Sequence, residues 1–203
     1  MIQIIIMFAI MQLGFNLLFK PNYNQMSCGL FGVAAGNVND INIDKLKILG
    51  IFNDTRGGHS CGLAIDGDII VGTYKTKMFK DLIIECDIEQ PDSLPVILGH
   101  TRFATGGAHN EENAHPFGFG NNNDYFSFIG THNGSLHNET ELAELFNVKT
   151  KESIKSTYNV TTYRTKIDSE ILLECIYKSG NFKVLENYEG GAALAIMVLL
   201  EKL

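Results

Sequence analysis

Three short segments, far apart along the chain, constrain this sequence more than any other feature. Cys28-Gly29-Leu30-Phe31-Gly32 places a thiol ahead of an apolar run, and GHTRFATGG at 99–107 places Arg102 at the end of a second run. His132-Asn133-Gly134 follows a third run and offers a side-chain amide beside a flexible backbone N–H. Short apolar runs bounded by Gly and Asn indicate buried strands. A nucleophile, a cation suited to a carboxylate and donors for an oxyanion are the groups that hydrolysis of an amino-acid side-chain amide requires.

Length and charge narrow the class of protein. The chain has 203 residues, of which 45% are hydrophobic, enough for one domain with a sizeable core. Its net charge is −7, with 16 Lys and Arg and no basic run, which argues against a nucleic acid or an anionic membrane surface as the partner. The cysteines are widely separated, so the spacing favours neither a zinc site nor a disulfide framework, and reduced thiols are typical of a cytoplasmic protein.

Local patterns predict an α+β domain. An Asp-Gly step at Asp66-Gly67-Asp68, between runs at 61–65 and 69–74, is a strong hairpin signal. Asn138 and Glu141 form a capping-box pattern for a helix reaching Phe146. We further expect strands at 28–35, 95–104, 125–131 and 192–200, helices at 43–52 and from Asp168 or Ser169 to Gly180, a long loop at 106–124, and a loop or irregular hairpin at 148–167. This pattern suits two stacked sheets covered by helices.

Three further strings complete a family pattern: RGGHSCG at 56–62, NAHPF at 113–117 and DSE at 168–170. With the first three segments, they resemble the glutaminase domain of the class II glutamine amidotransferases, which are N-terminal-nucleophile hydrolases. The resemblance runs from Cys28 to about Ala195. It implies an α+β fold, a four-layer αββα sandwich of two stacked, mainly antiparallel sheets, and a domain at 28–203. Family domains usually carry more C-terminal strands, so we expect a fragment or a stand-alone glutaminase.

The resemblance also implies the site. Cys28 would be the nucleophile, while the Asn133 side chain and the Gly134 backbone N–H would hold the oxyanion. Arg102 would bind the α-carboxylate of glutamine, and Asp168 would bind its α-amine.

Other family positions give a less complete match. Phe103 and Thr105 match substrate-contacting positions, whereas Gly106 stands where many members have a histidine. The family site uses no cofactor and no metal, so we interpret three histidines that could suggest a metal site as structural: His100, His115 and His132.

Each candidate also has an ordinary structural interpretation. A free cysteine is most often a buried packing residue, which is how we interpret Cys61, Cys86 and Cys175. Asn133-Gly134 alone would indicate a hairpin turn, and Asp168 alone an N-cap. The combination of motifs, rather than any single one, favours the site.

Residues 1–27 are a separate problem, because in this enzyme class the free α-amine of the nucleophile is the general base. Its pKa of about 7.7–8.0 lets it take the thiol proton at neutral pH, but an amide-bonded Cys28 has no such base. Residues 1–19 are uncharged and mostly apolar, without the basic n-region and the small-residue cleavage site that are typical of a signal peptide. We weigh three interpretations: a mis-assigned start or removable leader, a retained segment packed on the domain, and a membrane anchor. Starting at Met26 would still leave Ser27 ahead of the thiol.

The expected activity is hydrolysis of L-glutamine to glutamate and ammonia through a Cys28 γ-glutamyl thioester. The acceptor that uses the ammonia would be a synthase acting in trans or a missing C-terminal part, and the sequence does not identify it. Two alternatives stay open: a catalytically silent domain that binds glutamine or a protein, and a membrane-tethered form of the same domain.

Overall fold

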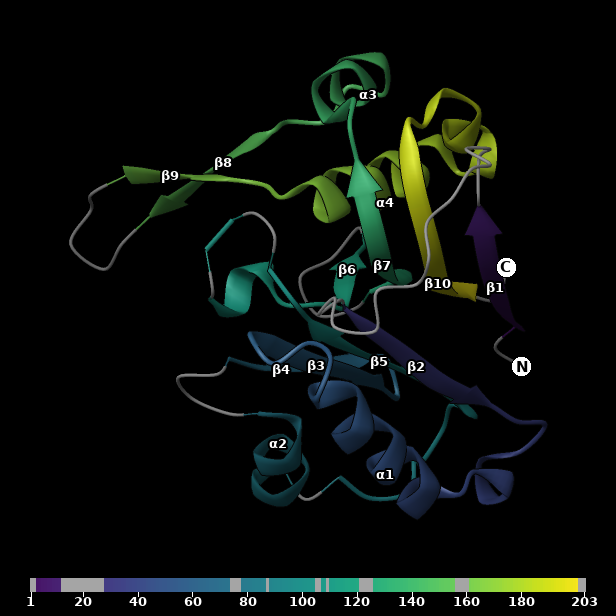
Figure 1. Ribbon diagram of the computed structural model, residues 1–203. Helices are drawn as coiled ribbons and strands as arrows, with labels where there is room; N and C mark the ends of the chain where they lie inside the picture. The colour runs from purple at the N-terminus through teal and green to yellow at the C-terminus, as the bar shows by residue number, and fades with distance from the viewer. Residues whose placement is uncertain are drawn as a thin grey trace, which may run out of the picture.

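The computed structural model describes residues 3–11, 28–73, 78–86, 88–104, 107–108, 110–120, 126–155 and 161–200. Two antiparallel four-stranded sheets are stacked face to face, and helices cover the outer face of each (Figure 1). The first sheet has the order β1 (Gln3–Met11), β10 (Gly190–Leu200), β7 (Phe128–Leu136), β6 (Phe117–Phe119). The second has the order β2 (Gly29–Ala34), β5 (Val96–Arg102), β3 (Ser60–Ile65), β4 (Asp68–Thr73). The predicted αββα arrangement is therefore present.

Each of the four α-helices described lies over one of the two sheets (Figure 1). α3 (Glu139–Leu145) and α4 (Asp168–Ser179) lie over the first sheet, and α1 (Ile43–Asp54) and α2 (Phe79–Glu85) lie over the second. The remaining elements of the described residues are three 3₁₀ turns, η1 (Val38–Asp40), η2 (Glu111–Asn113) and η3 (Phe182–Asn187), and a hairpin of β8 (Lys151–Lys155) with β9 (Thr161–Thr165).

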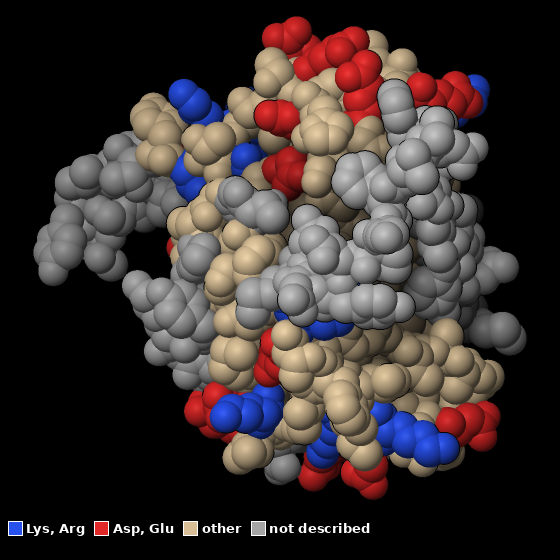
Figure 2. Space-filling model, viewed as in Figure 1, with Lys and Arg blue, Asp and Glu red and all other residues tan. Residues whose placement is uncertain are grey.

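Acidic side chains gather over α3, which carries Glu139, Glu141 and Glu144. Figure 2 shows this acidic surface at the top of the molecule, whereas acidic and basic side chains are interspersed over the layer of α1 and α2. On this face, acidic side chains are thus densest at the α3 end.

Local sequence explains several of these elements. The Asn42 side chain accepts a hydrogen bond from the Lys45 N–H and so caps α1. A Cβ at Gly50 would lie 1.9 Å from the Phe79 ring, so only glycine lets α1 approach α2 this closely. The β3–β4 turn has positive φ at Asp66 (52°) and Gly67 (91°), as a tight two-residue hairpin requires. The predicted hairpin and the helix at 43–52 are confirmed.

The layer between the sheets is apolar over most of its length and is formed from alternate residues of facing strands. Leu98 and Ile129 are buried there, and Leu30 packs against them. Side chains on a strand alternate between its two faces, so Cys28, Arg102 and Asn133 continue these three inward-facing rows. The rows end in polar groups at the same end of the sandwich.

Four expectations differ from the structure. β7 continues to Leu136 instead of ending at Thr131, because residues 128–136 pair with β10. The segment at 106–124 contains η2 and the edge strand β6, which pairs with β7. Asn138 makes no capping bond: its side chain accepts a bond from the Glu189 N–H and donates one to the Asn187 carbonyl. α4 begins at Asp168 with Ile167 as its N-cap, so the interpretation of Asp168 or Ser169 as the cap is wrong.

Residues 3–11 form the outer strand of the first sheet. β1 pairs with β10 from Gln3 opposite Leu200 to Met11 opposite Ala192. This pairing covers the edge that β10 would otherwise expose. Residues 12–27 lie outside the described part of the chain.

Candidate active site

Cys28 lies immediately before β2 and is half-buried. The Phe103 N–H donates a hydrogen bond to Cys28 Sγ at 3.3 Å, and Sγ lies 3.5 Å from the Phe103 carbonyl oxygen. A Cβ on the next residue, Gly29, would lie 2.3 Å from Asn53 Oδ1 and 2.6 Å from Thr101 Oγ1. Glycine after the thiol is therefore required for β2 to lie this close to α1 and β5.

The pKa of Cys28 is raised, with burial as the main cause. The Phe103 amide and the Arg102 charge act in the opposite direction, and Asp168 raises the pKa further. A raised pKa keeps the group as a thiol at neutral pH, so nucleophilic attack requires a base to take its proton. The charges of Arg102 and Asp168 thus both act on the Cys28 thiol, and the pKa of Arg102 responds to both of these groups.

Asn133 and Gly134 lie within β7, where they pair with Ala193 and Ala192 of β10. The interpretation of this dipeptide as a hairpin turn is therefore wrong. Asn133 Nδ2 donates a 3.0 Å hydrogen bond to the Cys28 carbonyl. A primary amide has two N–H groups, so one stays available for a ligand. A Cβ at Gly134 would lie 1.9 Å from the Gly191 carbonyl oxygen, which requires glycine there.

Arg102 ends β5 and is 5% exposed. Its Nη1 donates to the Ala108 carbonyl at 3.3 Å, and its charge interacts with Cys28 and Asp168. A guanidinium offers five N–H donors, so it can bind a planar carboxylate while keeping such a contact.

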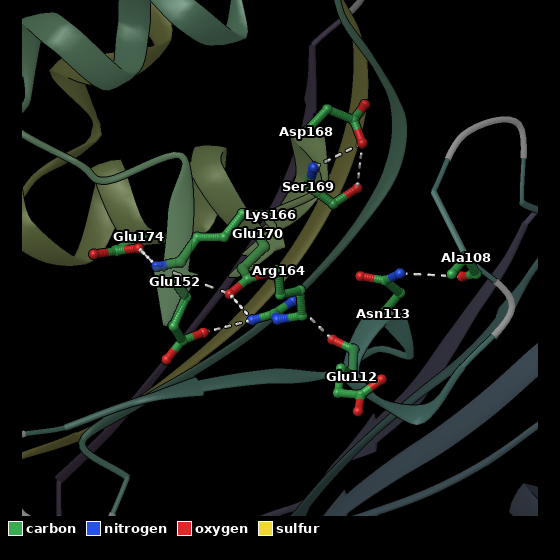
Figure 3. Close-up of polar contacts among 10 residues, drawn as sticks. All are labelled: Ala108, Glu112, Asn113, Glu152, Arg164, Lys166, Asp168, Ser169, Glu170 and Glu174. Atoms are coloured by element: carbon green, nitrogen blue, oxygen red, sulfur yellow. Dashed lines mark hydrogen bonds and ion pairs between the residues drawn. The ribbon is translucent and has the colours of Figure 1, made fainter. Parts of the chain in front are cut away.

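Asp168 is the first residue of α4. Its Oδ2 accepts a hydrogen bond from the Leu136 N–H at 3.3 Å, and its Oδ1 accepts one from the Ser169 N–H at 2.8 Å. Figure 3 shows Asp168 beside Ser169 at the start of the helix. These bonds fix the carboxylate at the junction of α4 and β7 and leave it capacity to accept further hydrogen bonds from an ammonium.

One residue of the site, His59, was not singled out from the sequence. His59 Nδ1 accepts a 2.9 Å bond from the Ala104 N–H, and its ring stacks on Phe103 with centroids 4.7 Å apart. His59 thereby orients the segment that contacts the thiol. Its place in the RGGHSCG string was the available signal. Thr105, a predicted substrate contact, lies outside the described residues, as does Gly106.

The three histidines interpreted as structural, His100, His115 and His132, are buried. The rings of His100 and His115 lie 4.2 Å apart, and His132 Nδ1 is 2.8 Å from Ser169 Oγ. Burial lowers the pKa of His100 to about 3 and that of His132 to about 4, and it holds the pKa of His115 well below its usual value. These imidazoles are therefore neutral at pH 7. Within the described ranges, no group of three or more His, Cys, Asp or Glu side chains is arranged to hold a metal ion.

Several curated proteins that are similar to this chain carry the same name. Glutamine–fructose-6-phosphate aminotransferases (isomerizing) are 31% identical over 185 residues in Streptococcus agalactiae and 32% identical over 189 residues in Methanosarcina acetivorans. Each alignment covers 84% of this chain and 27% of the relative. The chain thus spans about a quarter of the length of the curated relatives that it matches. No family model matches the sequence.

Solved structures show the same fold. A Bacillus subtilis glutamine phosphoribosylpyrophosphate amidotransferase complexed with ADP and GMP superposes with a TM-score of 0.55 at 22% identity, covering 83% of this chain and 35% of that one. A regulatory enzyme of purine biosynthesis gives a TM-score of 0.54. These likenesses confirm the predicted four-layer fold. Among the residues that the structure describes, none of the helices is both long and apolar enough to span a membrane.

Proposed function

Because this chain belongs to the class II glutamine amidotransferases and carries their glutaminase domain, we propose that it hydrolyses L-glutamine to glutamate and ammonia at Cys28. The observation that carries the proposal is the convergence of three elements on one residue. The Asn133 amide and the Phe103 N–H both contact Cys28, and the charges of Arg102 and Asp168 act on the same thiol.

The reaction begins when the thiol transfers its proton to the free α-amine of Cys28 and the sulfur attacks the γ-amide carbon. The second N–H of Asn133 and the Gly134 backbone N–H stabilise the oxyanion of the tetrahedral intermediate. The protonated amine then gives its proton to the leaving nitrogen, ammonia departs, and a γ-glutamyl thioester forms. Water attacks the thioester, which releases glutamate and restores the thiol.

Selectivity for an amino acid comes from two opposite charges. Arg102 binds the α-carboxylate through its planar fork, and Asp168 binds the α-ammonium. A ligand that lacks either group would lose one of these two charge-assisted contacts, which costs binding energy.

The mechanism requires hydrolysis of the Ser27–Cys28 peptide bond, since an amide nitrogen cannot act as the base. Water adds across this bond, which leaves a carboxylate on Ser27 and an amine on Cys28. With residues 1–27 attached, the domain would bind glutamine without turning it over, and this is our second candidate function.

We assign the use of the ammonia to a site outside residues 1–203. The chain spans only about a quarter of its curated relatives, so an acceptor site carried by a further polypeptide segment or a partner subunit fits this coverage.

The decisive experiment compares ammonia release from glutamine by a protein beginning at Cys28, by its Cys28→Ala variant and by the chain with residues 1–27 intact. We expect release only from the first. Cys86→Ala is the matched control, because that thiol is also half-buried but lies beside α2. Equal release by Cys28→Ala would overturn the proposal.

A further inference from the structure

Arg164 joins three segments that are separate in the sequence. Its Nη1 and Nη2 donate to Glu170 Oε2 and Oε1, each at 2.8 Å, which makes a two-bond fork. Nη2 also donates to Glu152 of β8 at 2.8 Å, and Nη1 donates to the Glu112 carbonyl of η2 at 3.3 Å. One guanidinium on β9 thus contacts the first turn of α4, strand β8 and η2 (Figure 3).

Two of these contacts lie next to Arg102 and Asp168, the two residues that are proposed to bind the ends of glutamine and are called the glutamine clamp below. Glu170 is two residues beyond Asp168 in the first turn of α4. Glu112 adjoins Asn113, whose side-chain amide donates to the Ala108 carbonyl at 3.1 Å, the same carbonyl that accepts from Arg102 at 3.3 Å. Arg164 is therefore hydrogen-bonded to the helix turn that carries Asp168, and also to η2, which contacts the same carbonyl as Arg102.

A close backbone approach holds the η2 side against α4. A Cβ at Gly107 would lie 2.7 Å from Ile167 Cγ2 and 3.5 Å from both Arg102 Nη2 and Asn113 Nδ2. Ile167 is the N-cap of α4 and precedes Asp168 directly. Gly107 is thus packed between Arg102 and the residue that precedes Asp168, and Arg102 and Asp168 are the two groups that are proposed to bind the two ends of glutamine.

The ion pair between Arg164 and Glu170 is largely buried, so it can fix the relative position of the two segments that it joins. The side chain of Arg164 is 15% exposed and that of Glu170 is 7% exposed, whereas Glu152 is 53% exposed. A buried two-bond fork fixes the plane and distance of both partners, and an exposed single contact does not. The bond to Glu170 is accordingly the one that sets the geometry.

We propose that Arg164 is a positioning residue for glutamine binding: by holding the first turn of α4 and η2 together, it fixes the separation between Asp168 and Arg102. This inference rests on the proposed function and adds a residue that does not itself touch glutamine. Loss of Arg164 frees the two halves of the clamp to separate, which weakens binding of a ligand that must reach both.

α4 supplies a matched control. Glu174 lies one turn beyond Glu170, is 12% exposed and pairs with Lys166 and Lys178. Neither of these ion pairs involves Arg164 or η2, although Lys166 Nζ also lies 3.9 Å from Glu170 Oε1. Glu170→Gln and Glu174→Gln thus both weaken ion pairs of α4 with the shared partner Lys166, but only the first also weakens the bond to Arg164 and so the link to η2.

The test measures glutamine affinity by titration calorimetry in the Cys28→Ala background, together with the melting temperature of each variant. We expect Arg164→Met and Glu170→Gln to bind glutamine roughly 3- to 30-fold more weakly, as expected for residues that act through another group. Glu174→Gln should bind within twofold of the parent at a similar loss of melting temperature. In the active protein beginning at Cys28, Arg164→Met should raise KM with kcat within twofold.

Two results would overturn the inference: unchanged affinity in Glu170→Gln, or an equal loss of affinity in Glu174→Gln. Glu170→Gln preserves side-chain shape, so it serves if Arg164→Met does not fold. If the Cys28→Ala parent binds no glutamine, the proposed function fails, and that result differs from a parent that binds glutamine as tightly as its variants.

Discussion

Asn133 Nδ2 donates a 3.0 Å hydrogen bond to the carbonyl of Cys28, although the two residues are 105 positions apart. β2 follows Cys28 in one sheet and β7 carries Asn133 in the other, so this bond crosses between the sheets. It holds the proposed nucleophile against the strand that carries the oxyanion donors.

This bond leads to a prediction for Asn133→Ala in the protein beginning at Cys28. Loss of the donor should lower kcat for glutamine about 10²- to 10³-fold, because one oxyanion donor is missing from the transition state. Steady-state ammonia release measures the effect. Asn138→Ala is the control, since that amide contacts Asn187 and Glu189 instead. A kcat within threefold of the parent would remove Asn133 from the oxyanion site.

A second prediction concerns the clamp. Arg102→Lys should weaken glutamine binding because an ammonium cannot form two parallel hydrogen bonds, and Asp168→Asn should weaken it by removing the counter-charge. Charge-assisted hydrogen bonds contribute roughly 1.5–3 kcal/mol each, which corresponds to losses of about tenfold to a hundredfold in affinity. Titration calorimetry in the Cys28→Ala background checks this, with the exposed Asp44→Asn as control. Unchanged affinity in both clamp variants would show that these residues do not bind glutamine.

A third prediction follows from the buried histidines. His100 and His132 have folded-state pKa values of about 3 and about 4, and that of His115 is also lowered. An unfolded histidine has a pKa of about 6.5, so below this pH the unfolded state binds more protons than the folded state. Their stabilising effect is complete above pH about 6.5 and is lost as the pH falls toward the folded-state values. From pH 7.5 to 5.5 the three together should lower the free energy of unfolding by about 4 kcal/mol.

Urea unfolding at these two pH values measures the difference. His100→Gln removes one of the three groups, so the difference between the two pH values should shrink by about 1.4 kcal/mol, whatever the variant does to stability at pH 7.5. A difference as large as that of the parent would mean that His100 does not remain neutral in the folded state.

A fourth prediction concerns the edge of the first sheet. β1 pairs with β10 along residues 3–11, so a protein beginning at Cys28 exposes the backbone donors and acceptors of β10. Exposed strand edges pair with other chains. We therefore expect this protein to associate in a concentration-dependent manner in light scattering coupled to size-exclusion chromatography. The full chain should associate less, and equal association of both would show that β1 does not protect the edge.

Local patterns determined a large part of the fold. The Asp66-Gly67 turn, the cap of α1 at Asn42 and the end of α4 at Gly180 depend on dihedral angles and on hydrogen bonds between near neighbours, which a short window contains. The family strings also named a thiol, a guanidinium and an amide that the structure brings to one end of the sandwich. Period-two alternation explains why these three share the inward face of their strands.

Tertiary structure decided the rest, because the competing interactions come from residues far away in the sequence. Asn133-Gly134 carries a turn signal, but pairing with Ala193 and Ala192 keeps it in a strand. Asn138 has a capping pattern with Glu141, yet its side chain bonds to the segment at 187–189 instead. Arg164 gave no signal of its own, because its four hydrogen bonds depend on how β8, η2 and α4 pack around it. The sequence by itself determined which chemical groups the site can contain, and only the packing of the two sheets and α4 decided which of them meet.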